Sequence, residues 1–454
     1  MGYIKLLLQN QQQLLITACV YLGPLLNGYS LGWSSPIIIK LSDVKQSPFK
    51  NYVSDNLISF TATAIYIGQI IGPMLILNVS DTKGRKPCLV ISTVITSLSY
   101  FILASATNIW TIIFGRIICG LGISMSYVLA SMYIGEISST NIRGILLNGS
   151  GVFLTFGCLL VYSVGPFVPY YAVNLLGLLI ALAQLAAVHY IVPESPIFHA
   201  MQGMDKEAAS TLETLNRHED IDLVVSGAKS EKFNGSLYKE LFTVRCNRRA
   251  FFITMPLAVL QQLSGIIVVT FYATSIFYMT GSSLDARIDT ILIGLTQFVA
   301  STFCPFLVER SGRKMLMMIS TSICSISLAV LGVFLYLSWT SNIIVDSILW
   351  LPLVSLIVYF IGLETGFGVI PTTLPGEMFS PNVRAIGTMI GYQIAMVFGL
   401  VLSAVFPLML DDMGPHITFW IFSFVCAFTC VYTMVFVPET RGKTLFEIQE
   451  ILSR

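Results

Sequence analysis

The chain has 454 residues, of which 55% are hydrophobic and only 11% carry a charged side chain. Soluble domains carry roughly 25% charged residues, so this composition, with a mean hydropathy of +0.79, excludes a soluble globular protein. A formal net charge of +1 gives no support to a nucleic-acid partner. We therefore expect a protein that lies in a lipid bilayer.

Hydrophobic runs of about 20 residues recur along the chain, and each can cross a hydrocarbon core of roughly 30 Å. Six runs precede a hydrophilic stretch and six follow it. They cover about 13–34, 57–79, 88–106, 110–133, 145–167, 171–192, 251–279, 287–308, 315–338, 348–374, 385–409 and 416–437. The sequence therefore predicts an all-α membrane protein with twelve transmembrane helices in two six-helix bundles.

These elements define four parts in chain order. They are an N-terminal six-helix bundle over 1–193, a cytoplasmic linker with short helices over 194–250, a C-terminal six-helix bundle over 251–437 and a cytoplasmic tail over 438–454. Residues 204–217 of the linker are rich in Ala, Leu and Glu, which predicts a surface helix. The linker is too short to bury much core, so we expect a connector rather than a separate binding module.

The distribution of positive charge predicts the orientation in the membrane. If both termini are cytoplasmic, the cytoplasmic segments hold twenty of the 25 Lys and Arg residues. The outer loops then hold only Lys40, Lys45, Lys50 and Arg287. Because positive residues concentrate on the cytoplasmic side of membrane proteins, we expect cytoplasmic termini, with the plasma membrane as the location. None of the nine cysteines falls in an outer loop, so structural disulfides are not expected.

A set of charged motifs occurs once in each half of the chain. The pairs are Asp81-Thr-Lys-Gly84-Arg85-Lys86 and Glu309-Arg-Ser-Gly312-Arg313-Lys314, then Glu136 with Arg143 and Glu377 with Arg384, then Pro193-Glu194-Ser195 and Pro438-Glu439-Thr440. The two copies are separated by roughly 228 to 245 residues. Such an offset indicates a duplicated unit, which is typical of many secondary transporters.

The repeated charges lie at the predicted cytoplasmic ends of the spans. A charge in the membrane interior costs several kcal/mol, so these side chains need water or a partner. We expect Arg85 to meet Glu136 and Arg143, and Arg313 to meet Glu377 and Arg384, as a latch that braces the outward-open form. The alternative is that they only mark membrane topology. Gly84 and Gly312 allow tight turns between antiparallel helices.

Several motifs together resemble the sugar porter family of the major facilitator superfamily. They are the two Gly-Arg-Lys turns, Tyr133-Ile-Gly-Glu136 with Arg143-Gly144, Pro193-Glu-Ser-Pro196, Gln261-Gln-Leu-Ser-Gly265 and Pro438-Glu-Thr-Arg-Gly442. The stretch from Gly28 to Pro36 is similar to the invertebrate trehalose-transporter-like branch. The resemblance implies sugar binding between the two bundles near mid-membrane and alternating access by rocking. It implies no cofactor and no metal.

The resemblance also assigns a gating network and a sugar site. The gating residues are Asp81, Arg85, Arg116, Glu136, Arg143, Glu194, Glu309, Arg313, Glu364, Glu377, Arg384 and Glu439. Gln261 and Gln262 provide carboxamides inside an apolar span, and an amide suits a sugar hydroxyl because it both donates and accepts hydrogen bonds. They could instead join helices as polar contacts. Gln297, Tyr272 and Thr372 are further candidates for the site.

Five positions depart from the residues that the family resemblance leads us to expect. Gly151 replaces a glutamine, Ile267 an asparagine, Thr372 a tryptophan, and Ala395 and Met396 an Asn-Trp pair. Each lost hydrogen bond is worth roughly 0.5–1.5 kcal/mol, so these departures are expected to weaken the binding of an ordinary hexose. Gln393, Tyr392 and Thr373 could compensate.

The predicted function is facilitative uniport of a hexose or trehalose. Proton-coupled members of the family carry an aspartate directly after the Gly-Tyr pair of span one, where this chain has Ser30. The alternatives are a non-transporting sugar sensor and a carrier of a polyol or another small polar solute. The chain shows no arrangement of Ser, His and Asp, no metal-spaced Cys and His, and no phosphate-binding loop, so it is not expected to be an enzyme. The oligomeric state stays open.

Overall fold

The computed structural model describes residues 10–43, 45–49, 53–139, 141–217, 221, 237–380, 383–441, 443 and 445–453. The chain divides into two compact units. Unit 1 comprises 1–33 and 40–233, and unit 2 comprises 34–39 and 234–454. Most of the predicted linker after residue 217 lies outside the described residues.

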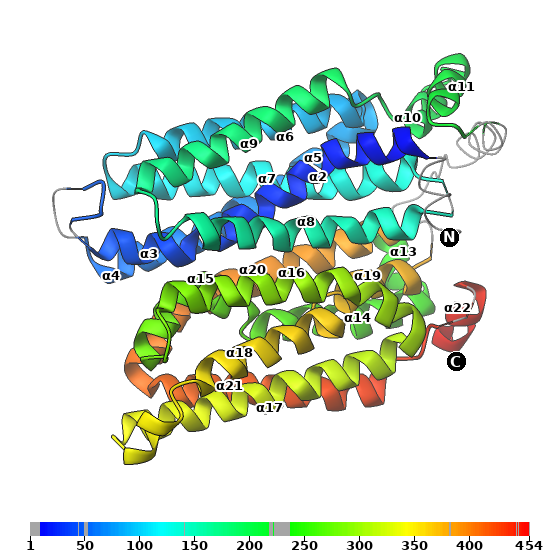
Figure 1. Ribbon diagram of the computed structural model, residues 1–454. Coiled ribbons are helices and arrows are strands. Elements are labelled where there is room, and N and C mark those ends of the chain that lie inside the picture. Colours follow the sequence, from blue (N-terminus) through cyan, green and yellow to red (C-terminus); the bar gives the residue numbers. More distant parts are fainter. Residues whose placement is uncertain are drawn as a thin grey trace. The chain divides into compact units, whose positions relative to one another are not determined.

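Unit 1 is a bundle of long helices followed by two short ones (Figure 1). Its helices are α2 (Gln11–Gly32), α4 (Asp55–Thr63), α5 (Ile65–Lys83), α6 (Arg85–Ala104), α7 (Ile109–Ile137), α8 (Arg143–Val164), α9 (Tyr170–Tyr190), α10 (Pro196–Met201) and α11 (Asp205–Thr214), while α3 (Ser34–Ser42) is divided between the two units. α2 packs along α8, and α7 packs against both α5 and α6. Small residues allow the close approach of α2 and α8, because a Cβ at Gly28 would overlap the carbonyl of Leu154.

Unit 2 is also a helical bundle. Its elements are α13 (Leu237–Thr243), α14 (Arg245–Leu263), α15 (Ile266–Thr280), α16 (Ala286–Ser311), α17 (Arg313–Trp339), the 3₁₀-helix η2 (Ile343–Ser347), α18 (Leu351–Gly362), the π-helical turn η3 (Leu363–Phe367), α19 (Ile370–Met378), α20 (Arg384–Met413), α21 (Pro415–Phe436) and α22 (Leu445–Ser453). α17 packs along α21, and α14 packs along α20.

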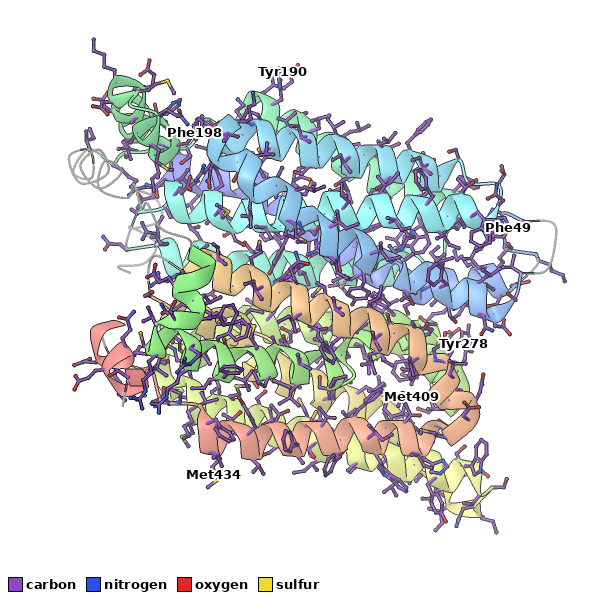
Figure 2. The ribbon with its side chains drawn as sticks, turned by 180° about the vertical axis from the view of Figure 1, so that it is seen from behind. Phe49, Tyr190, Phe198, Tyr278, Met409 and Met434 are labelled. Carbon is purple, nitrogen blue, oxygen red and sulfur yellow. The ribbon has the colours of Figure 1, made fainter. Side chains whose placement is uncertain are left out.

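The helices have the length and composition that a bilayer requires. Within the described residues, eleven helical segments are long and apolar enough to cross a membrane. α16, at the predicted eighth span, has 26 residues and is about 39 Å long at 1.5 Å per residue. Large apolar side chains point outward from both bundles; Figure 2 labels Tyr190 and Met434, which are 82% and 61% exposed. The predicted all-α membrane fold is confirmed.

Candidate functional site: the charged turns and the polar spans

The charged turn of unit 1 is built around the start of α6. Gly84 has a φ of 101°, and a Cβ at this position would overlap the Glu194 carboxylate. Oε1 of Glu194 accepts hydrogen bonds from the backbone N–H groups of Arg85 at 2.9 Å and Lys86 at 3.2 Å. A carboxylate at a helix N-terminus satisfies unpaired N–H groups and favours the helix dipole. The Pro-Glu-Ser motif after span six therefore caps span three.

The Arg85 side chain joins the same turn to the end of α7. Its Nε donates to Oε1 of Glu136 at 3.1 Å, and its terminal nitrogen lies 3.2 Å from Oδ1 of Asp81 and 2.8 Å from the carbonyl of Ser80. The Ser195 hydroxyl donates to the second oxygen of Glu136. Figure 2 labels Phe198, whose ring centroid lies 5.7 Å from the Arg85 guanidinium carbon. Spans three and four are thus fastened to the start of the linker.

Unit 2 repeats the central contacts of this arrangement. Glu439 accepts from the N–H groups of Arg313 at 3.0 Å and Lys314 at 3.2 Å. The Arg313 guanidinium donates to Oε1 of Glu377 at 3.0 and 3.1 Å, and the hydroxyl of Thr440 donates to Oε2 of Glu377 at 2.6 Å. The capping carboxylate, the arginine, its paired glutamate and the hydroxyl that donates to this glutamate therefore occur in both units.

The carboxylate of Glu439 is held in its charged form by this geometry. Partial burial acts to raise its pKa, but hydrogen bonds from the backbone N–H groups of Arg441, Arg313, Lys314 and Thr440 together lower it below the usual value. The cap of α17 is consequently strongest when Glu439 is ionised.

Some predicted gating residues do not form ion pairs within these networks. Arg143 donates to the carbonyl of Ser138 at 3.4 Å, and among the described residues neither Arg143 nor Arg384 is ion-paired to Glu136 or Glu377. Glu364 lies in η3 and takes part in none of the described ion pairs. The side chain of Glu309 lies outside the described residues.

The linker contributes two contacts that sequence reasoning missed. Gln13 of α2 donates to the carbonyl of Leu215 at 2.8 Å and accepts from the N–H of Ser139 at 3.0 Å. Arg217 donates to the backbone carbonyl of Glu136 at 2.8 Å. The end of α11 is therefore fixed to the same end of unit 1 as the charged turn. Neither contact has a recognisable motif, although the polar Gln-rich run before span one was a possible signal.

Arg116 is fully buried in unit 1 and joins three of its helices. Its guanidinium donates to the carbonyls of Ser30 at 2.8 Å and Thr61 at 3.3 Å, and its carbon lies 4.5 Å from the ring centroid of Trp33. The Ser30 hydroxyl lies 2.6 Å from the hydroxyl of Tyr100. The position of the family's aspartate is thus occupied by a hydroxyl that already has a hydrogen-bonding partner.

The candidate sugar-binding residues of unit 2 differ in how they are engaged. Nε2 of Gln261 donates to the carbonyls of Phe367 at 2.9 Å and Gly368 at 2.8 Å. The Oε1 atoms of Gln262 on α14 and Gln297 on α16 are buried and accept no hydrogen bond from any residue that the structure describes. These two amides keep an acceptor available, whereas both N–H groups of Gln261 are occupied.

The remaining candidates, Thr372 and Tyr272, contact residues of their own unit. Thr372 is exposed and its hydroxyl donates to the carbonyl of Val369 in its own helix at 2.7 Å. The ring of Tyr272 is buried against Phe406, with centroids 5.0 Å apart. At Gly151, where a glutamine is expected, a Cβ would meet no heavy atom within 4 Å.

Comparisons with known proteins agree with this architecture. A family profile described as "Sugar (and other) transporter" matches residues 16–452. Proteins named facilitated trehalose transporter Tret1 from Bombyx mori and Apis mellifera ligustica are each 30% identical over 446 residues, covering 96% of this chain and 86% and 87% of theirs.

Solved structures give the same result for the fold. The chain is similar to an inward-open xylose transporter XylE from E. coli, with a TM-score of 0.79 and 25% identity over 96% of this chain and 99% of that one. XylE bound to 6-bromo-6-deoxy-D-glucose, described as a major facilitator superfamily proton:xylose symporter, also gives 0.79, at 24% identity over 97% and 99% of the two chains. The protein is therefore a member of the sugar transporter family.

Proposed function

We propose that this protein is a facilitative sugar transporter of the plasma membrane that works by alternating access, with both termini in the cytoplasm. The relatives that carry the name facilitated trehalose transporter match almost the whole chain. The excess of Lys and Arg in the predicted cytoplasmic segments supports the orientation. The charged turns would then lie on the cytoplasmic side and act as gating contacts.

The environment of Ser30 is the observation that supports uniport over proton-coupled transport. A serine hydroxyl does not exchange a proton with water in the physiological pH range, unlike a carboxylate. Its oxygen is hydrogen-bonded to Tyr100 within unit 1. Span one therefore lacks a side chain at this position that could carry a proton with the sugar.

For the cargo, we favour a disaccharide such as trehalose over a hexose. Gly151 and Thr372 replace the glutamine and tryptophan expected at these positions. These replacements remove hydrogen-bonding partners that a single hexose ring would need. The names of the relatives agree with this choice.

Uptake of radiolabelled trehalose and glucose into proteoliposomes, with and without a proton uncoupler, tests the proposal. We expect saturable trehalose uptake that survives the uncoupler. Gly151→Gln should raise glucose uptake relative to trehalose by restoring a hydrogen-bonding partner for a single ring, whereas Gly144→Ala, where a Cβ also meets no heavy atom, should leave the ratio unchanged. Loss of uptake in the uncoupler would refute uniport, and glucose preference in the native protein would refute the cargo. No uptake of any sugar by correctly folded protein would favour a sensor.

A further inference from the structure

Two spans of unit 2 are interrupted. Between α14 and α15 the chain passes through Ser264 and Gly265, and Gly265 has a φ of +89°. Between α18 and α19 lies the π-helical turn η3, where the N–H of Gly368 donates to the carbonyl of Leu363 at 2.6 Å. Interruptions of this kind free backbone carbonyls, which inside a membrane must find other donors.

Each interruption is capped by a side chain from the other span. Gln261, at the end of α14, donates both N–H groups of its amide to the carbonyls of Phe367 and Gly368 just beyond η3. In return, the hydroxyl of Tyr359 on α18 donates to the carbonyl of Ser264 at 3.3 Å. α14 packs against α19, and α15 against α18, so the two breaks are neighbours within the unit (Figure 1).

A third side chain holds η3 from its opposite side. The hydroxyl of Ser320 on α17 donates to the carbonyl of Gly362 at 2.6 Å and accepts from the N–H of Phe367 at 2.8 Å. It thus bridges the two ends of the π-helical turn. Ser320, Tyr359 and Gln261 are all buried, so these hydrogen bonds lie in the interior of the unit.

We propose that the two breaks form one hinge, in which the Gln261 amide binds either the carbonyls of span ten or a hydroxyl of the transported sugar. The proposal rests on the proposed function, because it requires a polyhydroxylated cargo. An amide has two N–H groups, and both are committed to span ten. A sugar oxygen that accepts from Nε2 must therefore displace Phe367 or Gly368. Sugar binding would release span ten at η3 and couple occupancy to movement.

The neighbouring amide provides a matched comparison. Gln262 lies one residue further along α14, and its buried Oε1 has no partner among the described residues. No described hydrogen bond joins it to span ten. Both glutamines would contact sugar, but only Gln261 would hold the hinge. If Gln261 were only a polar contact between helices, sugar binding would not change hydrogen exchange in span ten.

Hydrogen–deuterium exchange of residues 363–369 in the full-length protein, measured with and without saturating trehalose, tests the proposal. In the native protein, trehalose should accelerate exchange. Gln261→Met keeps the side-chain length but removes both donors, so exchange without sugar should already be about tenfold faster and trehalose should have little further effect. Gln262→Met should leave exchange without sugar unchanged while raising the KM for uptake. Tyr359→Phe should also accelerate exchange at residues 363–369, but less than Gln261→Met, because it removes one hydrogen-bond donor instead of two.

The outcomes separate this proposal from the proposed function. Trehalose uptake with exchange at 363–369 that responds neither to sugar nor to Gln261→Met would overturn the hinge and leave the transporter intact. Absence of trehalose binding and uptake, with exchange accelerated in Gln261→Met, would instead overturn the cargo. If Gln261→Met fails to fold, Tyr359→Phe carries the same test, and an unchanged exchange rate in that variant would count against the hinge.

Discussion

Replacing Arg85 by Ala should weaken unit 1 much more than Arg313→Ala weakens unit 2, although each arginine pairs with the corresponding glutamate of its unit. The side chains of Arg85 and Glu136 are 5% and 13% exposed, whereas those of Arg313 and Glu377 are 23% and 29% exposed. Removing one member of a buried ion pair costs about 3–5 kcal/mol, because the other charge stays buried without its partner. Exposed pairs contribute about 0–1 kcal/mol.

The difference can be given a magnitude. Arg85→Ala also removes the hydrogen bond to Ser80 and the contact with the Phe198 ring, but leaves Glu136 its bond from Ser195. We therefore place its cost at about 3 kcal/mol and that of Arg313→Ala at about 1 kcal/mol. A free-energy difference of 1.4 kcal/mol corresponds to a factor of ten in an equilibrium constant. The opened form of the turn should therefore become about 100-fold more populated in Arg85→Ala and about fivefold more populated in Arg313→Ala.

Thiol labelling measures this opening at a matched position in each unit. Cys88 is buried three residues after Arg85, and Leu316 is buried three residues after Arg313. In detergent, a variant with Cys88 as its single cysteine reports on unit 1, and a cysteine-free variant carrying Leu316→Cys reports on unit 2. Arg85→Ala should accelerate labelling at Cys88 about 100-fold, with Arg85→Lys intermediate because it keeps the charge but loses the fork of donors.

Two results would refute this reasoning. Equal acceleration in the two units would show that depth of burial does not decide the strength of the turn. Unchanged labelling of Cys88 in Arg85→Ala would show that the network does not hold the start of α6 closed.

Three further predictions follow from single contacts. Hydrogen bonds lower the pKa of Glu439 in the folded protein, so its contribution to stability is complete above the unfolded pKa of about 4.3 and is lost as the pH falls through the folded pKa. The difference in Tm between the native protein and Glu439→Gln should therefore shrink on acidification. A difference that stays constant would contradict this. Gly84→Ala should destabilise by about 1–3 kcal/mol because of its positive φ, whereas Gly144→Ala, in open space within α8, should be neutral or stabilising in the same Tm measurement. Gln13→Ala should raise hydrogen exchange at 211–217 about tenfold by removing the bond to Leu215; no change there would mean that other contacts fix α11.

The fold was predictable because the bilayer imposes a strong rule on sequence. Every span must satisfy its own backbone and present apolar side chains to lipid, so length and hydropathy locate the helices almost unaided. The charged turns were predictable for a related reason, since charge in a chain this apolar is costly and its repetition in both halves is conspicuous. The pairs Arg85–Glu136 and Arg313–Glu377 lie where the repeat suggested.

The parts that escaped prediction depend on contacts between residues far apart in the chain. The adjacent glutamines 261 and 262 look equivalent in sequence, but only the first lies beside the carbonyls freed by a turn about a hundred residues later. Gly366, Gly368 and Pro371 predict a break in span ten, but the local pattern does not predict the π-helical form of the turn between residues 363 and 367. Similarly, the hydroxyls of Ser195 and Thr440 belong to a conspicuous motif, but their bonds to Glu136 and Glu377 required the packing.

The repeat has preserved one feature of the two units and altered another. In both units an arginine at the start of the third span pairs with a glutamate at the end of the fourth span, and a second glutamate caps the third span. The spans that the repeat pairs are not alike: α2 continues into α3 with helical dihedrals at Trp33, and α7 runs unbroken from Ile109 to Ile137. Their counterparts in unit 2 are interrupted at Gly265 and at η3.

This asymmetry indicates where bending is concentrated. An unbroken helix resists bending because every turn is hydrogen-bonded, whereas an interrupted helix can bend when a few side-chain hydrogen bonds change partners. Within unit 2 those bonds come from Gln261, Tyr359 and Ser320. If unit 1 moves as a rigid body and unit 2 bends at its breaks, substitutions in α7 at positions other than Arg116 and Glu136 should change transport only through stability. Substitutions of the three capping side chains should change the turnover rate in protein whose Tm is unaltered.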